Sequence, residues 1–346
     1  RHSLLAASGA GRRFAQDPAA GWLALSRAIP GVQDRAPLAM DAPARLDRAV
    51  AADRYDDAVA ILAEVPADDP ARASCEMSVR RIGGHLTEVA DSTSPTDARG
   101  RRTRANALRQ RADLLSALPS WATRRPSAFS SNDAEAPARI LHVVNNSLPR
   151  TQAGSTIRTH SIARAQRGAG WDARVVTRPG YPVLRGSLTV ADEEIYDAVT
   201  YRHLLPATLP SGDAYFDAYR RLLLEVVDSW KPHVLHAASD HVNARAALEA
   251  GRLRGIPVAY EARSLHEDTW LAAHAAPGAE DSDTYRWMRE RHTEVMLAAD
   301  VVTTLSVSMK DDILARGVDA ERVFVVPNAV DMRFLAPIVS PEVART

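Results

Sequence analysis

The sequence predicts an α/β protein in which an α-helical region precedes a Rossmann-like, doubly wound and mostly parallel sheet. Three observations support this fold class. Short apolar runs, such as 139–144 and 173–177, have the length and composition of buried parallel strands. Segments of helical length, such as 213–230, separate the runs, and this alternation favours parallel pairing through right-handed crossovers. Before residue 138 the chain shows helical spacing without such runs.

The N-terminal region is expected to be helical over 42–65, 71–90 and 98–118. Within the first of these, 54–62 resembles half of a tetratricopeptide-type repeat. Because repeat solenoids need about three copies to bury a core, a plain helical hairpin is the preferred interpretation. The stretch 119–137 holds three prolines and no sustained apolar period, which is typical of a linker.

Arginines crowd the third expected helix, where Asp113 is the only acidic residue between positions 99 and 125. A solvated helix face is the preferred explanation. The alternative is contact with an acidic partner or with anionic lipid headgroups, which would associate the protein peripherally with a membrane.

The second half of the chain alternates between expected strands and expected helices. Together with the linker, this pattern divides the chain into a helical region (1–118), a linker (119–137), a sheet domain (138–335) and the start of a further connection (336–346). The expected strands are 139–144, 173–177, 233–236, 257–260, 301–305 and 323–326, with 194–204 as a further extended segment. The expected helices are 155–168, 213–230, 242–254, 283–299 and 308–316.

The composition excludes several classes of function. The 43 lysines and arginines balance 43 acidic residues, so the chain lacks the cationic surplus of a dedicated nucleic-acid binder. The single cysteine, Cys75, can form neither an internal disulfide nor a cysteine-rich zinc site, and it is expected as a small residue within a helix. No run approaches the ~18 to 20 apolar residues of a membrane span. A cytoplasmic protein is the expectation.

The loop after the first expected strand is the first candidate site, because ligands of doubly wound sheets bind at the carboxyl ends of strands. Gly154 lets the backbone approach a ligand, Ser155 lies where a helix starts, and Arg158 adds charge one turn later. These residues predict a phosphate site, although helix capping alone is the commoner explanation. The loop lacks the dinucleotide Gly-x-Gly-x-x-Gly fingerprint, and the chain has neither a Walker lysine loop nor a Gly-x-Ser-x-Gly elbow.

Two later strand ends supply a second candidate site for an acceptor. His236, Ser239, Asp240 and His241 follow one strand, where the histidines could donate to a sugar hydroxyl and Asp240 is also a natural helix cap. Glu261 and Arg263 follow the next strand, as the start of a polar floor or as a structural ion pair.

A metal site is not expected. Asp281-Ser282-Asp283 has the Asp-x-Asp form of metal-dependent sugar transferases, but it opens an expected helix, so capping explains it better. The histidines show no metal-ligand spacing.

The order of these segments resembles the N-terminal, acceptor-side domain of family 4 glycosyltransferases, which are retaining enzymes of the GT-B fold. The most specific matches are Ala299-Asp300-Val301-Val302-Thr303-Thr304-Leu305-Ser306 and Val323-Phe324-Val325-Val326-Pro327-Asn328-Ala329-Val330-Asp331. Further matches are Pro232 to His236 and Gly255 to Arg263. The stretch 154–160 together with 164–171, and the stretch 176–182, resemble the capsular and exopolysaccharide branch. Ala329 replaces the usual glycine, and Ala238 stands where some members place a donor-contacting histidine.

The resemblance implies a glycosyltransferase of polysaccharide or glycoconjugate assembly that needs no metal or other cofactor. Its partners would be a nucleotide-sugar donor and a glycan or lipid-linked acceptor. Gly154, Ser155 and Arg158 would face the donor phosphates, and His236, Ser239, Asp240, His241, Glu261 and Arg263 would shape the acceptor pocket. The family's main donor-binding domain would begin near Thr346, so we expect this chain to be inactive alone. A non-enzymatic interaction module and another nucleotide-binding α/β enzyme are the alternatives.

Overall fold

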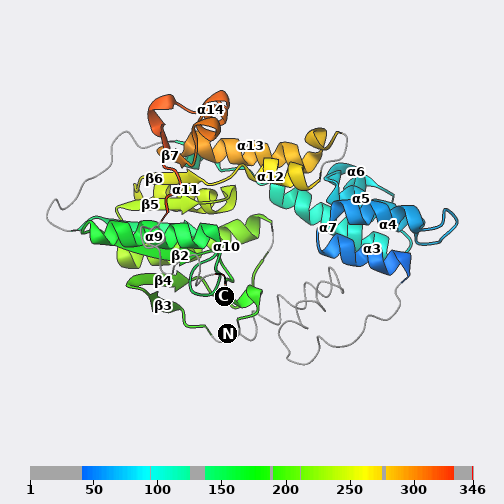
Figure 1. The fold of residues 1–346 in the computed structure, drawn as a ribbon, viewed down its shortest axis with the longest axis horizontal. Coiled ribbons are helices and arrows are strands. Elements are labelled where there is room, and N and C mark those ends of the chain that lie inside the picture. The colour runs from blue at the N-terminus through cyan, green and yellow to red at the C-terminus, as the bar shows by residue number, and fades with distance from the viewer. Residues whose placement is uncertain are drawn as a thin grey trace.

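The computed structural model describes residues 41–330 apart from 94, 125–136, 188–189, 211 and 275–277, together with residue 345. In this part of the chain the predicted fold class is confirmed, because helices precede a doubly wound, mostly parallel sheet (Figure 1). Residues 1–40, most of the expected linker, and all of the expected connection except residue 345 lie outside the described residues.

The sheet has the strand order β3-β4-β2-β1-β5-β6-β7-β8, and every neighbouring pair is parallel except β3 with β4. Its strands are β1 (Arg139–Val144), β2 (Asp172–Thr177), β3 (Glu193–Tyr196), β4 (Val199–His203), β5 (Val234–Ala238), β6 (Val258–Ala262), β7 (Val301–Thr304) and β8 (Val323–Val325). The expected extended segment 194–204 is therefore a hairpin. Its turn is made by Asp197 and Ala198, whose φ angles of 45° and 64° reverse the chain in two residues.

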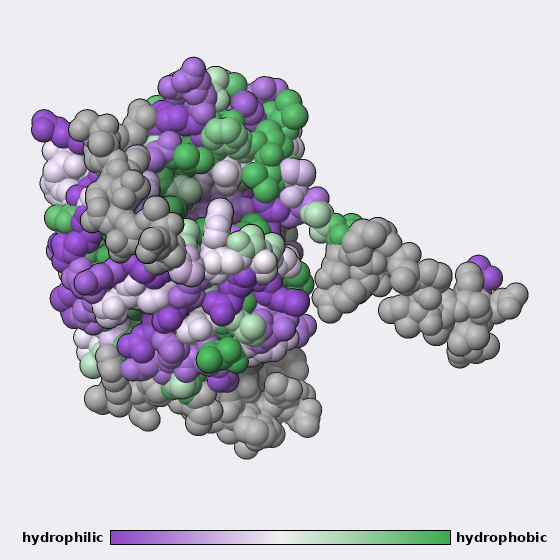
Figure 2. All heavy atoms as spheres, turned by 90° about the vertical axis from the view of Figure 1, so that its left-hand side faces the viewer, coloured by the Kyte–Doolittle hydropathy of each residue, from purple (hydrophilic) through white to green (hydrophobic). Residues whose placement is uncertain are grey.

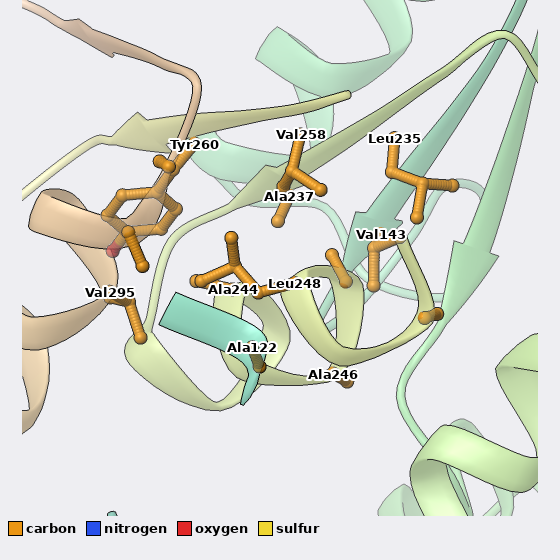
Figure 3. Close-up of a cluster of buried hydrophobic side chains, with 14 of the residues drawn as sticks. Ala122, Val143, Leu235, Ala237, Ala244, Ala246, Leu248, Val258, Tyr260 and Val295 are labelled. Atoms are coloured by element: carbon orange, nitrogen blue, oxygen red, sulfur yellow. The ribbon is translucent and has the colours of Figure 1, made fainter. Parts of the chain in front are cut away.

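Helices cover both faces of the sheet, and the strand side chains alternate between them. Leu141 and Val143 of β1 face the larger core, into which α11 packs, whereas Val144 faces a smaller core with Ala163 of α9. Figure 3 shows α11 buried in the larger core, with Ala122 packed against it. The helices of this half are α9 (Gly154–Gly168), α10 (Asp213–Trp230), α11 (His241–Arg254), α12 (His266–Ala273), α13 (Asp283–Ala298) and α14 (Val307–Ala315).

The N-terminal region is helical, as expected, but two of its expected helices are each divided in two. The chain turns at Asp53, with a φ of 54°, and at Gly84, with a φ of 90°. The resulting helices are α3 (Ala42–Ala51), α4 (Tyr55–Glu64), α5 (Arg72–Ile82), α6 (Leu86–Asp91) and α7 (Ala98–Leu115). Buried Cys75 lies within α5, and α3 and α4 form the expected hairpin.

These helices pack directly against the sheet half. The backbone amide of Thr87 donates to Asp283 at 2.7 Å, and that of Thr284 donates to the Gly84 carbonyl at 3.2 Å. The first residues of the expected linker form a short helix, α8 (Ser120–Thr123), in which Ala122 is fully buried. Apolar side chains inside the proline-rich stretch thus join the larger core, so the beginning of this stretch is not a free linker.

The arginines of α7 form a solvated face only in part: Arg101 is exposed, but three others contact neighbouring helices. Arg99 donates two hydrogen bonds of 2.9 Å to Asp47 of α3, and Arg104 donates to the carbonyl of Ala90. Arg111 pairs with Asp91 at 3.0 Å. The positive charge therefore ties α7 to its neighbouring helices, a role that spacing along one helix does not reveal.

No helix within the described ranges combines the length and apolar character that crossing a bilayer requires. The face on the left of Figure 1 carries mostly hydrophilic side chains with smaller hydrophobic groups between them (Figure 2).

Candidate functional site

The strand order reverses at β1, because the chain continues from β1 to β2 on one side and later places β5 on the other. In open α/β sheets such a switch point opens a crevice at the carboxyl ends of the two strands, where ligands bind. The loop 145–153 follows β1, and Ser239 and Asp240 follow β5. The topology therefore brings together the two segments from which the candidate sites were predicted.

The first turn of α9 leaves two backbone amides open at this crevice. Thr156 uses its hydroxyl to accept from the Ala153 amide at 3.0 Å, but no described residue accepts from the amides of Gly154 or Ser155. A side chain at Gly154 would meet no atom within 4 Å, so the space beside these amides is open. Free amides and the positive end of a helix dipole favour an anion here.

A hollow of about 720 Å³ lies at the carboxyl edge of the sheet, in front of this helix end. Five of the predicted site residues line it: Gly154, Ser155, Arg158, Ser239 and Arg263. His236, Asp240, His241 and Glu261 do not line it. Sequence reasoning missed other lining residues, namely Asn145, Asn146, Ile157, Ile162, His266, Leu305, Pro327 and Asn328. Asn145 directly follows the first strand, and this position at the carboxyl end of a strand is the signal that could have identified it.

Glu261 is buried behind the hollow and holds two arginines. Its Oε1 lies 2.7 Å from Nε of Arg158, and its Oε2 lies 2.6 Å from Nη2 of Arg263. The carboxyl is 1% exposed; burial alone would raise its pKa, but His236, 3.4 Å away, and Arg263 hold the pKa well below its ordinary value. The ion pair with Arg263, one of the two expected roles, is confirmed. Because two guanidinium groups share one carboxylate, these three side chains keep a net positive charge beside the hollow.

Arg158 is occupied by the protein itself. Its Nη2 donates to the Val326 carbonyl at 2.7 Å, and its Nη1 donates to the Pro327 carbonyl at 3.0 Å and to Oδ1 of Asn328 at 3.1 Å. Arg158 therefore fixes α9 to the segment that follows β8. Most of its N–H donors are used within the protein, and its charge lies beside the hollow.

Asp240 is an organising residue at the switch point. Its carboxylate caps α11 by accepting from the Asn243 amide at 3.2 Å, as the capping interpretation predicted. It also accepts from Asn145 at 3.0 Å and lies 3.5 Å from Arg178. Burial opposes its ionisation, but Arg178 and His241 keep its pKa below the ordinary value. The side chain thus connects the loops after β1, β2 and β5.

The two histidines near Asp240 lie away from the hollow. Burial lowers the pKa of His241 to about 4, so this ring is neutral near pH 7. His236 lies beside His142, with ring centroids 4.7 Å apart and the ring planes tilted by 39°.

Ser239 has an unusual backbone for a residue with a side chain. Its φ of 86° lies in the left-handed region, which for a non-glycine residue costs about 1–3 kcal/mol and occurs preferentially at functional sites. Its amide donates to the Glu261 carbonyl at 3.2 Å, and its carbonyl accepts from the Tyr260 hydroxyl at 2.8 Å. Among the described residues its own hydroxyl has no partner, and the residue lines the hollow.

The Asp-x-Asp sequence is used for helix capping. Ser282 caps α13 by accepting from the Tyr285 amide, and Asp283 accepts from Thr87. The described part of the chain contains no group of three or more histidine, cysteine or acidic residues placed to hold a metal ion.

The sequence matches the family model of the glycosyl transferase 4-like domain over residues 153–329, slightly more than half of the chain. The chain therefore belongs to this family. The match begins immediately before α9 and ends in the segment that Arg158 holds, so it spans most of the candidate site. A comparison with curated proteins finds no match.

Several solved structures align with part of this chain at low sequence identity. Sucrose-phosphate synthase from Thermosynechococcus elongatus aligns with a TM-score of 0.43 and 14% identity, over 58% of this chain and 50% of that one. A glycosyltransferase from Rickettsia africae aligns with a TM-score of 0.40 and 14% identity, over 60% and 48%. UDP-N-acetylglucosamine 2-epimerase from Rickettsia bellii aligns with a TM-score of 0.39 and 13% identity, over 61% and 49%. The chain thus spans about half the length of these structures.

Proposed function

We propose that this chain forms the acceptor-side half of a glycosyltransferase that moves a sugar from a nucleotide-sugar donor to a glycan or lipid-linked acceptor. The family membership supports the reaction class. The observation that carries the proposal is the open first turn of α9 at the switch point, where the amides of Gly154 and Ser155 have no acceptor among the described residues and lie beside the hollow.

Chemically, this arrangement suits departure of a nucleoside diphosphate. When the bond between the sugar and the diphosphate breaks, negative charge develops on the leaving phosphate oxygen. The amides of Gly154 and Ser155 would stabilise that charge without rearrangement, as would the net positive charge of Glu261 with its two paired arginines. Arg158 would act here mainly through its charge, because most of its donors are already used within the protein.

Finer features of the reaction are part of the same proposal. We propose transfer with retention of configuration, without a metal ion, in polysaccharide or glycoconjugate assembly in the cytoplasm. Most of the donor would be held by a second domain, so this half alone would bind donor weakly and not turn it over. The apolar lining from Ile157, Ile162 and Leu305 suits a donor or acceptor with an apolar face.

A titration with inorganic pyrophosphate and a panel of nucleoside diphosphate sugars, followed by amide NMR, tests this function. We expect millimolar binding with the largest shifts at Gly154 and Ser155. Gly154→Val should weaken pyrophosphate binding by about tenfold or more, because the side chain fills the approach to the amides.

Gly168→Val is the matched control, since Gly168 lies in the same helix and its side chain would also meet no atom within 4 Å. It should bind pyrophosphate like the wild-type chain. Equal binding by both variants and the wild-type chain would contradict the proposed phosphate site.

A further inference from the structure

A chain of buried polar side chains leads away from the hollow, starting at Ser239. The Ser239 carbonyl accepts from the Tyr260 hydroxyl at 2.8 Å, and that hydroxyl lies 2.8 Å from Nε2 of His292. Nδ1 of His292 lies 2.9 Å from Oε2 of Glu267, whose Oε1 lies 2.5 Å from Nη1 of Arg316. Tyr260 and Glu267 are fully buried, and His292 is 1% exposed. None of these side chains lines the hollow.

The hydroxyl of Tyr260 has one proton but two polar neighbours, the Ser239 carbonyl and Nε2 of His292. A carbonyl oxygen only accepts, so the single hydroxyl proton of Tyr260 lies between Tyr260 and Ser239. The Tyr260 oxygen must then accept from Nε2 of His292. On the other side of the ring, burial would raise the pKa of Glu267, but His292 and Arg316 lower it to about 2, so Glu267 is an ionised acceptor. Nδ1 of His292 therefore faces a carboxylate, which can only accept.

This series of hydrogen bonds ends at Ser239, whose backbone conformation needs support from its neighbours. Ser239 keeps a left-handed backbone only if surrounding contacts over-determine it. Its amide is held by the Glu261 carbonyl and its carbonyl by Tyr260. Its hydroxyl, which has no partner in the described part of the chain, lies beside the hollow. If His292 lost its Nε2 proton, the Tyr260 hydroxyl would have to donate to His292, and the Ser239 carbonyl would lose its partner.

We propose that His292 donates from Nε2 to Tyr260 and from Nδ1 to Glu267, and that it is thereby a positioning residue that holds Ser239 in its left-handed conformation and presents the Ser239 hydroxyl to the ligand. The part concerning the ligand rests on the proposed function. His292 and Tyr260 act only through Ser239 and do not touch the ligand themselves.

A double-mutant cycle with inorganic pyrophosphate as the probe tests the coupling. Tyr260→Phe and Ser239→Ala should each weaken binding by about tenfold, as loss of one hydrogen bond would. The double variant should bind no more weakly than Ser239→Ala alone, because Tyr260 acts through Ser239. If the two effects multiplied to roughly hundredfold weaker binding in the double variant, the proposal would be overturned. Unchanged binding by Tyr260→Phe would also overturn it.

Tyr201→Phe is a closely matched control. The Tyr201 hydroxyl lies 2.7 Å from Nδ1 of His160, whose Nε2 lies 3.3 Å from Asp197, and Tyr201 is 1% exposed. This second tyrosine–histidine–carboxylate chain does not reach the hollow. Tyr201→Phe should therefore leave pyrophosphate binding unchanged. A tenfold loss in this variant as well would mean that any buried tyrosine substitution disturbs the site, and would overturn the specific role of Tyr260.

A measurement on the wild-type chain is independent of the ligand. Nitrogen-15 spectra of the histidine rings should show protons on both ring nitrogens of His292 at neutral pH, and carbon-13 shifts should show the left-handed backbone of Ser239 relaxing in Tyr260→Phe. A bare ring nitrogen on His292, or an unchanged Ser239 backbone in the variant, would overturn the positioning role. If pyrophosphate does not bind the wild-type chain, the proposed function fails while these spectra still decide the role of His292.

Discussion

Replacing Arg158 with methionine should destabilise the fold, although Arg158 lies at the edge of the hollow. The substitution removes the 2.7 Å ion pair with Glu261 and the hydrogen bonds to Val326, Pro327 and Asn328. The Arg158 side chain is only 10% exposed, so these contacts are largely shielded from solvent.

The size of the effect follows from the burial of Glu261. Removing one partner of a buried ion pair costs about 3–5 kcal/mol when the other charge is left uncompensated. Glu261 keeps two hydrogen bonds from Arg263, at 2.9 and 2.6 Å, so the loss is partial. We therefore expect the free energy of unfolding to fall by about 2–3 kcal/mol.

Urea denaturation followed by circular dichroism measures this difference. With a denaturant slope of about 3 kcal/mol/M, the midpoint should fall by roughly 0.7–1 M. Arg164→Met is the control on the same helix, because Arg164 and its partner Asp197 are 48% and 50% exposed, and it should cost less than about 1 kcal/mol. Equal midpoints for the two variants would refute the buried clamp.

Two further predictions concern stability. Gly84→Ala should destabilise the fold by about 1–3 kcal/mol more than Gly317→Ala. The two glycines have φ angles of 90° and 89°, but only at Gly84 would the new side chain lie 2.7 Å from Ser282 and Trp270. Equal urea midpoints for the two variants would contradict this contact. Burial lowers the pKa of His142 to about 3. Below pH 6.5 the unfolded chain therefore binds more protons than the folded chain, and stability decreases as the pH is lowered. Between pH 6.5 and pH 5 the wild-type chain should lose about 2 kcal/mol more than His142→Gln; parallel pH profiles in urea denaturation would show that His142 is not the titrating group.

Much of the sheet half could be predicted because its strands are short apolar runs and its helices have clear ends. The predicted helix 213–230 coincides with α10, and the predicted strand 139–144 coincides with β1. Helix breaks were harder, since Asp53 adopts a positive φ that its residue type does not require. The helix α12 was missed because its polar sequence suggested a loop with ligand-binding side chains, whereas Glu267 is fully buried.

The candidate site could be predicted only as far as chain topology determines it. Strand ends meet at the switch point, so the positions of Gly154 and Ser239 at one hollow follow from the sequence pattern. Whether a polar side chain can contact a ligand or is already hydrogen-bonded within the protein depends on partners that are distant in the sequence. The pairing of Arg158 with residues 326–328 and the link from Tyr260 to His292 join segments that no local pattern relates.

The most direct test of the central claim is a crystal structure of the chain soaked with a nucleoside diphosphate sugar. Our account predicts the diphosphate within hydrogen-bond distance of the Gly154 and Ser155 amides, inside the hollow at the switch point between β1 and β5. A diphosphate bound at another part of the surface, with the first turn of α9 left empty, would contradict it.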